Sequence, residues 1–488
     1  MTTTTTQPVA LTQGEQLRQS PAVRNAISAI VAEVRSRSSH LTDVRGPRTP
    51  ELSTAFKQAL DTAAAVRGRA IYYPYLGSGL GNGPFVELLD GSVKLDMLTG
   101  IGAQFFGHSD PELIGVALEA ATSNVALQGH LTGNEEAVRF AELILDQAKR
   151  HSRMSHCFLT NNGAMANENA LKICFQKHVP ASRVIAFENC FMGRSWAMSQ
   201  IGDAAANRVG LPLNVNVDYM PFYDPVAARQ LQSGDVSGST RFIDLAVKRL
   251  RQYVERYPLQ HACFVFELVQ GEGGFNTAPP EFFRELIKVC KDAKIAVWDD
   301  EIQTFGRTTS MFAYEALGIG ADIDILCFGK MTQVCGVLYA ADYNPKPGLL
   351  SATFLGSTDA LRVGRRIIER LRDGDYYGPS GRIARHHEHF VRHARALIGR
   401  HPEWFPPCDE VTDLVGGTGG MMRFTPYGGK KDPVLKLCNA LFDEGLITFY
   451  CGHGPWHVRM LPPLGILDEA IWPRCFQLIE AAMMKMSA

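Results

Sequence analysis

The sequence lacks the features that mark membrane, secreted or nucleic-acid-binding proteins. No run approaches the roughly twenty apolar residues that a membrane-spanning helix requires. Lys and Arg number 49 against 50 Asp and Glu, and this net charge of −1 offers no basic surface for nucleic acid or an anionic membrane. Met1 is followed by five threonines, without the basic and apolar segments of a signal peptide. We therefore expect no nucleic acid and no membrane among the partners.

Paired cysteines and a dinucleotide fingerprint are also missing. The 11 cysteines are odd in number and form no C-x-x-C pair, and Cys157, Cys263 and Cys327 lie in apolar segments typical of buried thiols. We expect no metal site and a reducing, cytoplasmic location. The Gly-dense stretch 77–83 does not match G-x-G-x-x-G, and no strand–helix unit surrounds it. This excludes a dinucleotide site there.

The chain has 488 residues, of which 45% are hydrophobic, enough for two or three domains around a large core. Polar residues 1–20 are predicted to be disordered, and 21–70 show helical periodicity, so 1–70 is interpreted as a partly disordered N-terminal extension. Residues 71–130 should form the first part of a small domain, with a hairpin that turns at Asp90-Gly91.

The middle of the chain alternates helices with short apolar strands. This pattern indicates a mostly parallel sheet flanked by helices, which we assign to a large domain at 131–370. An Arg/His-rich helix, a Gly-rich segment at 416–420 and a closing helix suggest that 371–488 completes the smaller α+β domain. The strands are expected at 156–160, 183–187, 262–267, 294–298 and 323–328.

Two apolar strands end in charged residues, at Asp300 and at Lys330. In an open α/β sheet, ligands bind beyond the carboxyl ends of the strands, so these two charges should meet in one crevice. A lysine that forms a Schiff base and a carboxylate that keeps a pyridine nitrogen protonated are what pyridoxal phosphate requires. The alternative is a structural ion pair.

Residues 156–172 read as a short strand, a turn through Asn161, Asn162 and Gly163, and an Ala-rich helix. The free N–H groups and the dipole of a helix start form an anion site. Gly163 and Ala164 are too small to block a phosphate from the backbone. The alternative is an ordinary turn and helix cap.

The ordered set of motifs resembles the class III pyridoxal-phosphate aminotransferases (ornithine, acetylornithine and 4-aminobutyrate type) of fold type I. The resemblance spans about residues 70–480, and the lysine loop GKMTQVCG (329–336) is most similar to the lysine 6-aminotransferase branch. It implies an α/β fold, with a mostly parallel seven-stranded sheet in the large domain and a small α+β domain built from both chain ends. The motifs are FGHSDP (106–111), NNGAMANE (161–168), FMGR (191–194), ELVQGEGG (267–274), DEIQTFGR (300–307), FGK (328–330) and VRMLPPL (458–464).

The resemblance implies catalytic roles for Lys330 and Asp300. Lys330 would bind the cofactor and then move the proton between the substrate carbon and the cofactor. Asp299 would point to the opposite face of the strand, because neighbouring strand residues alternate. Thr353 would reach the phosphate of a neighbouring subunit, which implies a homodimer with shared sites, possibly a tetramer. The implied cofactor-binding residues are Asn162, Gly163, Ala164, Phe191, Glu267, Asp300, Gln303, Lys330 and Thr353.

The substrate residues implied by the resemblance are Glu272, Arg459 and Arg194. Arg459 would bind the carboxylate of 2-oxoglutarate, and Glu272 would pair with Arg459 when the other substrate has no carboxylate there. Arg194 would be a second carboxylate clamp. The alternatives are a permanent ion pair for Glu272 and Arg459 and a surface position for Arg194.

The sequence thus predicts an aminotransferase that passes the terminal amine of a lysine-like donor to 2-oxoglutarate by a ping-pong mechanism, giving an aldehyde and glutamate. Alternatives are an ornithine, acetylornithine or 4-aminobutyrate aminotransferase, and an aminomutase or decarboxylase on the same fold. A non-enzymatic cofactor-binding regulator would be expected to lack Lys330 or Asp300, and both are present.

Overall fold

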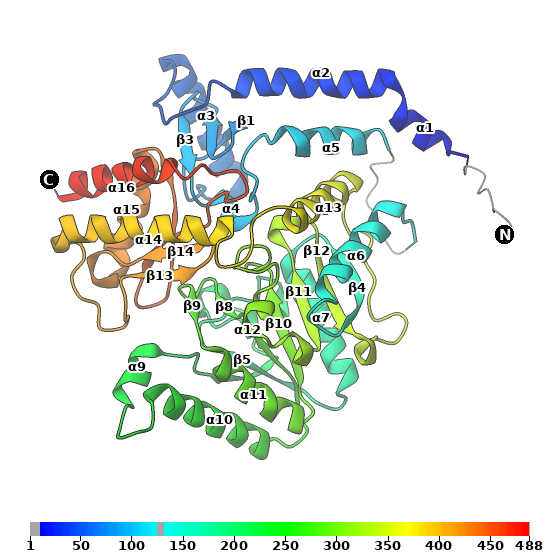
Figure 1. Cartoon of the computed structure of the whole chain (residues 1–488), viewed down its shortest axis with the longest axis vertical. Helices are drawn as coiled ribbons and strands as arrows, with labels where there is room; N and C mark the ends of the chain where they lie inside the picture. Colours follow the sequence, from blue (N-terminus) through cyan, green and yellow to red (C-terminus); the bar gives the residue numbers. More distant parts are fainter. Residues whose placement is uncertain (1–9, 124–130, 488) are drawn as a thin grey trace.

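The centre of the computed structural model is a seven-stranded sheet of order β4-β12-β11-β10-β7-β5-β6 (Figure 1). Neighbouring strands from β11 to β6 pair in parallel, and β12 runs antiparallel to both β11 and β4. The mostly parallel sheet is therefore confirmed. Its strands are β4 (Met154–Thr160), β5 (Arg183–Phe187), β6 (Asn216–Met220), β7 (His261–Phe266), β10 (Ala296–Glu301), β11 (Ile325–Phe328) and β12 (Cys335–Ala340). The structure describes residues 10–123 and 131–487.

Helices cover both faces of this sheet, so its central strands are buried throughout, as parallel strands usually are. Ala166 and Ala170 of α7 belong to the apolar cluster on one face, together with Trp298 of β10. Phe282 of α11 and Leu326 of β11 belong to the cluster on the other face. The helices around the sheet are α6 (Glu135–Ala148), α7 (Gly163–Lys177), α8 (Trp196–Ile201), α9 (Pro225–Gln230), α10 (Gly238–Arg256), α11 (Pro280–Asp292), α12 (Ala313–Leu317) and α13 (Thr358–Asp373).

Strand β10 is longer than predicted. The expected strand ended at residue 298, but β10 continues through Asp299, Asp300 and Glu301. The reason is its neighbour β11, which pairs in register with Asp299 and Glu301 and so extends the ladder past the apolar residues. The acidic residues therefore lie within the buried strand rather than after it.

Besides the two-stranded pair β8-β9, the described part of the chain contains two four-stranded sheets, which Figure 1 shows beside α14–α16. One is antiparallel, of order β13-β14-β17-β16. The other, β1-β2-β3-β15, joins the two chain ends, because β15 pairs in parallel with β3. The bounds are β1 (Gly77–Asn82), β2 (Phe85–Leu88), β3 (Val93–Asp96), β13 (Val415–Thr418), β14 (Met421–Phe424), β15 (Leu446–Ile447), β16 (Phe449–Cys451), β17 (His457–Met460), α14 (Arg382–Arg400), α15 (Lys431–Asp443) and α16 (Ile471–Ser487).

The predicted hairpin is confirmed: β2 and β3 are antiparallel, and Gly91 in the turn has a φ of 76°, which favours glycine. Short elements connect the sheets at α4 (Thr99–Gly102), α5 (Pro111–Ala121), β8 (Val269–Gln270) and β9 (Asn276–Thr277). Among the described residues, no helix combines the length and apolar character needed to cross a membrane.

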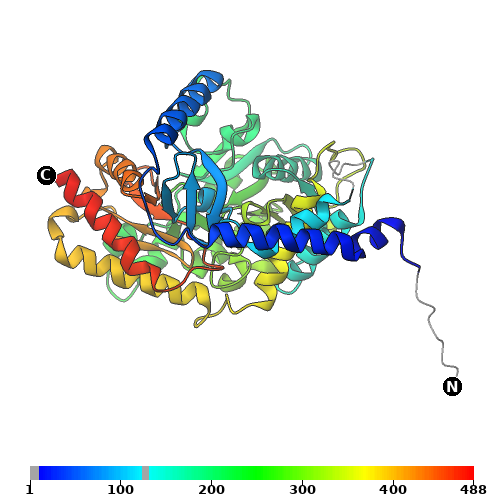
Figure 2. The ribbon, with the colours of Figure 1, turned by 90° about the horizontal axis from the view of Figure 1, so that it is seen from above.

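The N-terminal extension is helical. It forms α1 (Gln13–Gln19), α2 (Pro21–Ser38) and α3 (Pro50–Arg67), and Figure 2 shows α1 and α2 running along the outside of the molecule. The predicted disorder is wrong for Gln13–Gln19, because Thr12 and Glu15 form a capping box that satisfies the first N–H groups of α1. Residues 1–9 lie outside the described residues. The domain boundaries at 70, 130 and 370 stay predictions.

Candidate active site

Lys330 and Asp300 line one cavity of about 190 Å³ at the carboxyl ends of β10 and β11. Asp300 pairs with Cys327 across the two strands, and Lys330 follows the end of β11 by two residues. The cavity is lined by Gly163, Ala164, Asn167, Phe191, Met192, Gly193, Glu267, Glu272, Asp300, Ile302, Gln303 and Lys330. The structure therefore brings together most of the residues that the sequence motifs predicted.

Burial lowers the pKa of Lys330 to about 8, although the negative charge of Glu272 acts in the opposite direction. The φ of Lys330 is 51°, in the left-handed region. This backbone conformation sets the direction in which the side chain leaves the main chain. A lysine with this pKa is partly a free amine near neutral pH, the form that attacks a carbonyl group.

Asp300 is held by two hydrogen bonds. The backbone N–H of Ile302 donates to its Oδ1 (2.9 Å), and the Nδ2 of Asn167 donates to its Oδ2 (2.7 Å). Burial raises the pKa of Asp300 to about 6, and these hydrogen bonds oppose the rise. Sequence reasoning missed Asn167, which also donates to the carbonyl of Met192 (2.9 Å). The only signal was its position, one helical turn after Gly163.

Asp299 does not line the cavity. Its side chain is 0% exposed, and neither carboxyl oxygen has a hydrogen-bond partner among the residues that the structure describes. Burial, followed by the charge of Glu301, raises the pKa of Asp299 well above its usual range. Glu301 accepts hydrogen bonds from Thr304 and from the N–H groups of residues 313 and 314, so the proton stays on Asp299.

The start of α7 forms a cup with little side-chain bulk. Asn162 caps the helix, because its Oδ1 accepts a hydrogen bond from the N–H of Met165 (2.9 Å). A Cβ on Gly163 would lie 3.0 Å from Ile302, and a Cβ on Gly193 would lie 2.7 Å from the Cβ of Ala164. These glycines are needed for the close packing of the cup, and the first N–H groups of α7 suit a phosphate.

Glu267 organises another part of the cavity lining. Its two oxygens accept hydrogen bonds from the N–H of Phe191 (3.0 Å) and of Gly271 (2.9 Å). Burial raises the pKa of Glu267 to about 8, and the negative charge of Asp300 adds to the rise. The amide oxygen of Gln303 is buried without a hydrogen-bond partner in the described part of the chain. An unsatisfied buried amide beside a cup for phosphate fits a ligand that carries its own polar groups.

Arg459 and Glu272 form an ion pair at the cavity, with 2.8 Å between Nη2 and Oε1. The side chain of Arg459 is 0% exposed and that of Glu272 is 26% exposed. Burial alone would raise the pKa of Glu272, but the charge and hydrogen bond of Arg459 bring it below the usual value. The guanidinium also lies over the rings of Phe449 (5.5 Å) and Phe275 (6.0 Å).

Four predicted residues are outside the cavity lining. Asn162 caps α7 beside the lining residue Gly163, and Arg459 pairs with the lining residue Glu272, whereas Arg194 and Thr353 have no such contact with the lining in the described structure. Arg194 is exposed and forms no ion pair within the described residues. Thr353 is also exposed and does not line the cavity of its own chain. The roles assigned to these two residues stay predictions.

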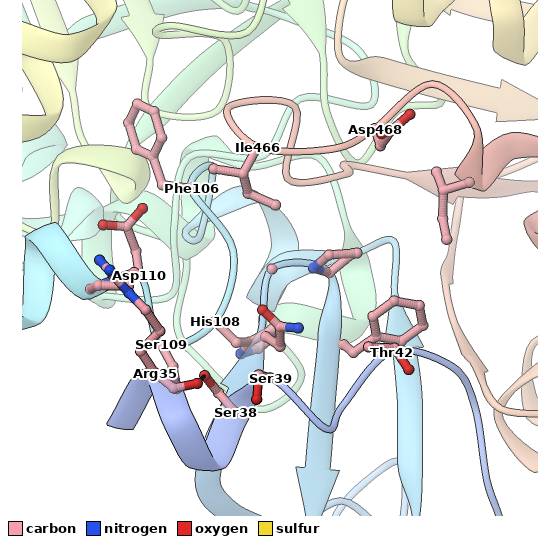
Figure 3. A pocket seen from close by; sticks show the side chains of 16 residues that line it. Arg35, Ser38, Ser39, Thr42, Phe106, His108, Ser109, Asp110, Ile466 and Asp468 are labelled. Atoms are coloured by element: carbon pink, nitrogen blue, oxygen red, sulfur yellow. Dashed lines mark hydrogen bonds between the residues drawn. The ribbon is translucent and has the colours of Figure 1, made fainter. Parts of the chain in front are cut away.

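A larger cavity, of about 690 Å³, lies between the end of α2, the turn after β1 and the loop before α5 (Figure 3). His108 in this cavity is bound to Asp96 (2.9 Å), and Asp110 is bound to Arg370 (2.9 Å). Its lining shares no residue with the cavity at Lys330. The residues expected to hold the cofactor line the other cavity, so we assign the active site to the cavity at Lys330.

The chain belongs to the class III aminotransferase family, whose sequence model matches residues 78–483. These enzymes use pyridoxal 5′-phosphate, and the lysine, carboxylate and helix-start cup described above fit that cofactor. The L-lysine-epsilon aminotransferase of Mycobacterium tuberculosis is 28% identical over 425 residues, which cover 80% of this chain and 88% of that protein.

Other relatives differ in activity. An alanine/serine racemase of Pyrococcus horikoshii is 26% identical over 472 residues, covering 90% of this chain and 91% of the racemase. The solved lysine aminotransferase of M. tuberculosis superposes with a TM-score of 0.70 at 23% identity, covering 87% of this chain and 98% of that one. These similarities define the fold and the family of the chain, but they do not identify its amino donor.

Proposed function

We propose that this aminotransferase moves the terminal amino group of a lysine-like donor to 2-oxoglutarate, with an aldehyde and glutamate as products. The observation that carries the proposal is the buried ion pair between Arg459 and Glu272 at the cavity of Lys330. The similarity of the lysine loop and the 28% identity to a lysine aminotransferase support this donor over the ornithine, acetylornithine and 4-aminobutyrate types.

The ion pair lets one cavity accept two unlike substrates. A donor that ends in an amine presents no carboxylate to Arg459, so Glu272 stays on the guanidinium. An oxo acid with a second carboxylate replaces Glu272, whose partly exposed side chain can turn toward solvent. The buried guanidinium has an anionic partner in both half-reactions, which avoids the cost of an unpaired buried charge.

The other residues have roles that follow from their contacts. When bound, pyridoxal phosphate supplies an aldehyde and a ring that accepts electrons. Lys330 holds the cofactor and then carries a proton to and from the reacting carbon, which its pKa of about 8 permits near neutral pH. Asp300, fixed by Asn167, holds the proton on the ring nitrogen. The start of α7 at Gly163 would bind the phosphate.

The remaining assignments concern Phe191, Glu267, Gln303 and the partner subunit. Phe191 would stack on the cofactor ring, Glu267 fixes the backbone of Phe191, and Gln303 would contact the phenolic oxygen. Thr353 completes the site of a second copy, so the active form is a homodimer that can pair into a tetramer. Its exposed position away from the cavity of its own chain supports this role. The exposed guanidinium of Arg194 clamps a substrate carboxylate.

A donor screen tests the proposal. Holoenzyme is mixed with 2-oxoglutarate and, separately, lysine, ornithine, N-acetylornithine or 4-aminobutyrate, and glutamate is measured. We expect the highest yield from lysine. If another donor is turned over faster, the proposed reaction type still holds but the proposed donor is wrong. The proposed reaction would be refuted if no donor gave glutamate and the enzyme instead racemised alanine or serine. The same holds if it isomerised or decarboxylated an amino acid.

A further inference from the structure

Arg307, in the loop after β10, buries a guanidinium that has no carboxylate partner in the described part of the chain. The residue is 1% exposed. Its Nη2 donates to the carbonyl of Gly102 (2.5 Å), its Nη1 donates to the carbonyl of Pro462 (3.4 Å), and its Cζ lies 5.5 Å from the centre of the Phe105 ring. Burial lowers the pKa of Arg307 to about 9, so the group stays mostly protonated near neutral pH. A buried charge with only neutral partners costs stability, which a contact between apolar side chains would avoid.

The carbonyl of Gly102 belongs to a left-handed turn. Four successive residues, 99–102, have φ angles between 54° and 87°, and Thr99 and Ile101 among them are not glycines. Such a backbone is unfavourable for residues with a side chain and persists only where its neighbours hold it. A Cβ on Gly102 would lie 2.9 Å from the Nε of Arg307, so the turn and the guanidinium fit closely. Arg307 therefore holds the end of a strained turn.

This turn is bound to the chain segment that follows Arg459. The hydroxyl of Thr99 donates to the carbonyl of Leu461 (2.7 Å), and Arg307 donates to the carbonyl of the next residue, Pro462. Strand β17 carries Arg459 and ends directly before Leu461. The guanidinium of Arg307 thus joins the left-handed turn to the end of β17.

The backbone of Arg307 is tied to the strand that carries Asp300. The N–H of Arg307 donates to the carbonyl of Thr304 (2.9 Å), and the N–H of Phe305 donates to the carbonyl of Glu301, the last residue of β10 (3.0 Å). These two short turns connect Arg307 to the end of β10, where Asp300 lines the cavity. One buried side chain therefore links β10 to the end of β17.

This link matters most in the acceptor half-reaction. An oxo acid that reacts at the cofactor and places its second carboxylate on Arg459 is held at both ends, so its binding depends on the distance between β10 and β17. With a lysine-like donor, the pair of Arg459 and Glu272 stays closed (2.8 Å) and helps to hold β17. When the oxo acid displaces Glu272 that contact opens, whereas the contacts of Arg307 are with backbone carbonyls and persist.

We propose that Arg307 is a positioning residue that fixes Arg459 relative to Asp300 and thereby sets the chain length of the dicarboxylic oxo acid. The inference rests on the proposed function and deepens it, because it concerns the acceptor of the same site. A misplacement of about 1 Å at a reacting centre costs up to about 100-fold, so a shift of β17 by part of that distance corresponds to roughly 10-fold.

The test follows single turnovers of the holoenzyme through the absorption of the cofactor. The amine form reacts with 2-oxoglutarate or with oxaloacetate, which is one carbon shorter, and the aldehyde form reacts with lysine. We expect Arg307→Met to raise the half-saturating concentration of 2-oxoglutarate about 10-fold and that of lysine less than about 3-fold. The ratio between the two oxo acids should move toward one, and Arg307→Lys, which restores the charge, should recover most of the loss. Arg307→Gln replaces the Met variant if that variant does not fold.

Arg382→Met is the matched control. Arg382 also donates to the chain after β17, at the carbonyls of Leu464 (2.7 Å) and Leu467 (2.6 Å), but it does so from α14 rather than from the loop after β10. We expect this variant to change the three half-saturating concentrations equally or not at all.

An unchanged half-saturating concentration of 2-oxoglutarate in the neutral Arg307 variants overturns the inference. Equal losses with lysine and both oxo acids, or the same pattern in Arg382→Met, also overturn it and reduce Arg307 to a structural residue. An unchanged ratio between the two oxo acids refutes the role in chain length. Arg459→Met tests the proposed function separately: if it leaves the reaction with 2-oxoglutarate intact, the proposed function fails. If it damages that reaction and Arg307→Met does not, only the inference about Arg307 fails.

Discussion

Replacing Glu272 by Gln should reverse the preference of the enzyme for its two amino donors. The substitution keeps the size of the side chain and removes the charge that faces Arg459 at 2.8 Å. Arg459 is 0% exposed, so without Glu272 its charge is buried and unpaired until a ligand supplies a carboxylate. Glutamate, which carries that carboxylate, should become the better donor, and the lysine-like donor should become worse.

The size of the effect follows from the burial of the pair. Leaving one charge of a buried, hydrogen-bonded pair without its partner costs about 2–5 kcal/mol, or roughly 30- to several-thousand-fold in binding. The side chain of Glu272 is 26% exposed, and the carbonyl of Gly271 also accepts from Arg459 (3.4 Å). Water and this carbonyl partly replace the lost partner of Arg459. We therefore expect the binding free energy to change by the lower end of the range, about 2–3 kcal/mol.

Rapid-mixing absorption spectra of the cofactor measure each half-reaction separately. The aldehyde form is mixed with lysine or with glutamate, and the amine form with 2-oxoglutarate. Arg459→Met is the matched control, because it should weaken only the reactions of glutamate and 2-oxoglutarate. Equal losses with every substrate, in both variants, would show that Glu272 and Arg459 form a permanent structural pair, and the case for a dual-substrate site would be lost.

Four further predictions follow from the site. Lys330→Ala should abolish turnover, and borohydride reduction of the unmodified protein should attach the cofactor at Lys330; attachment at another lysine contradicts the assignment. Asp300→Ala should retain the cofactor but lose most turnover, because nothing keeps the ring nitrogen protonated; near-normal rates would refute this role. Mixing Lys330→Ala subunits with Thr353→Ala subunits should restore some activity, since one site of the mixed dimer has both residues intact; no recovery, when homodimers of both variants assemble, argues against a shared site. Burial raises the pKa of Asp299 in the folded protein above the ordinary value for aspartate, about 3.9. Between these two pKa values the folded protein holds one more proton than the unfolded chain. The free energy of unfolding should therefore fall by about 1.4 kcal/mol for each pH unit of rise in this window. Asp299→Asn should remove that slope from unfolding curves measured across pH, and an unchanged slope would mean that Asp299 is ionised.

The sequence by itself predicted the chemistry of the site. The strand–charge pattern at Asp300 and Lys330, the turn and helix at Gly163, and the order of the motifs predicted the cofactor, the fold class and most of the cavity lining. These features are local: the alternation of a strand separates Asp299 from Asp300, and a turn followed by a helix start presents its free N–H groups within a few residues.

The tertiary structure alone decided which distant residues meet. Asn167 holds Asp300 across 133 positions of the chain, and its place one helical turn after Gly163 does not specify this contact. The extension of β10 through Glu301 depends on its ladder with β11. Likewise, the register of β14 and β17 places Arg423 beside Arg459, and a shift of one residue would send Arg423 to the other face. Register and long-range pairing arise from packing between elements, which short-range periodicity in the sequence does not specify.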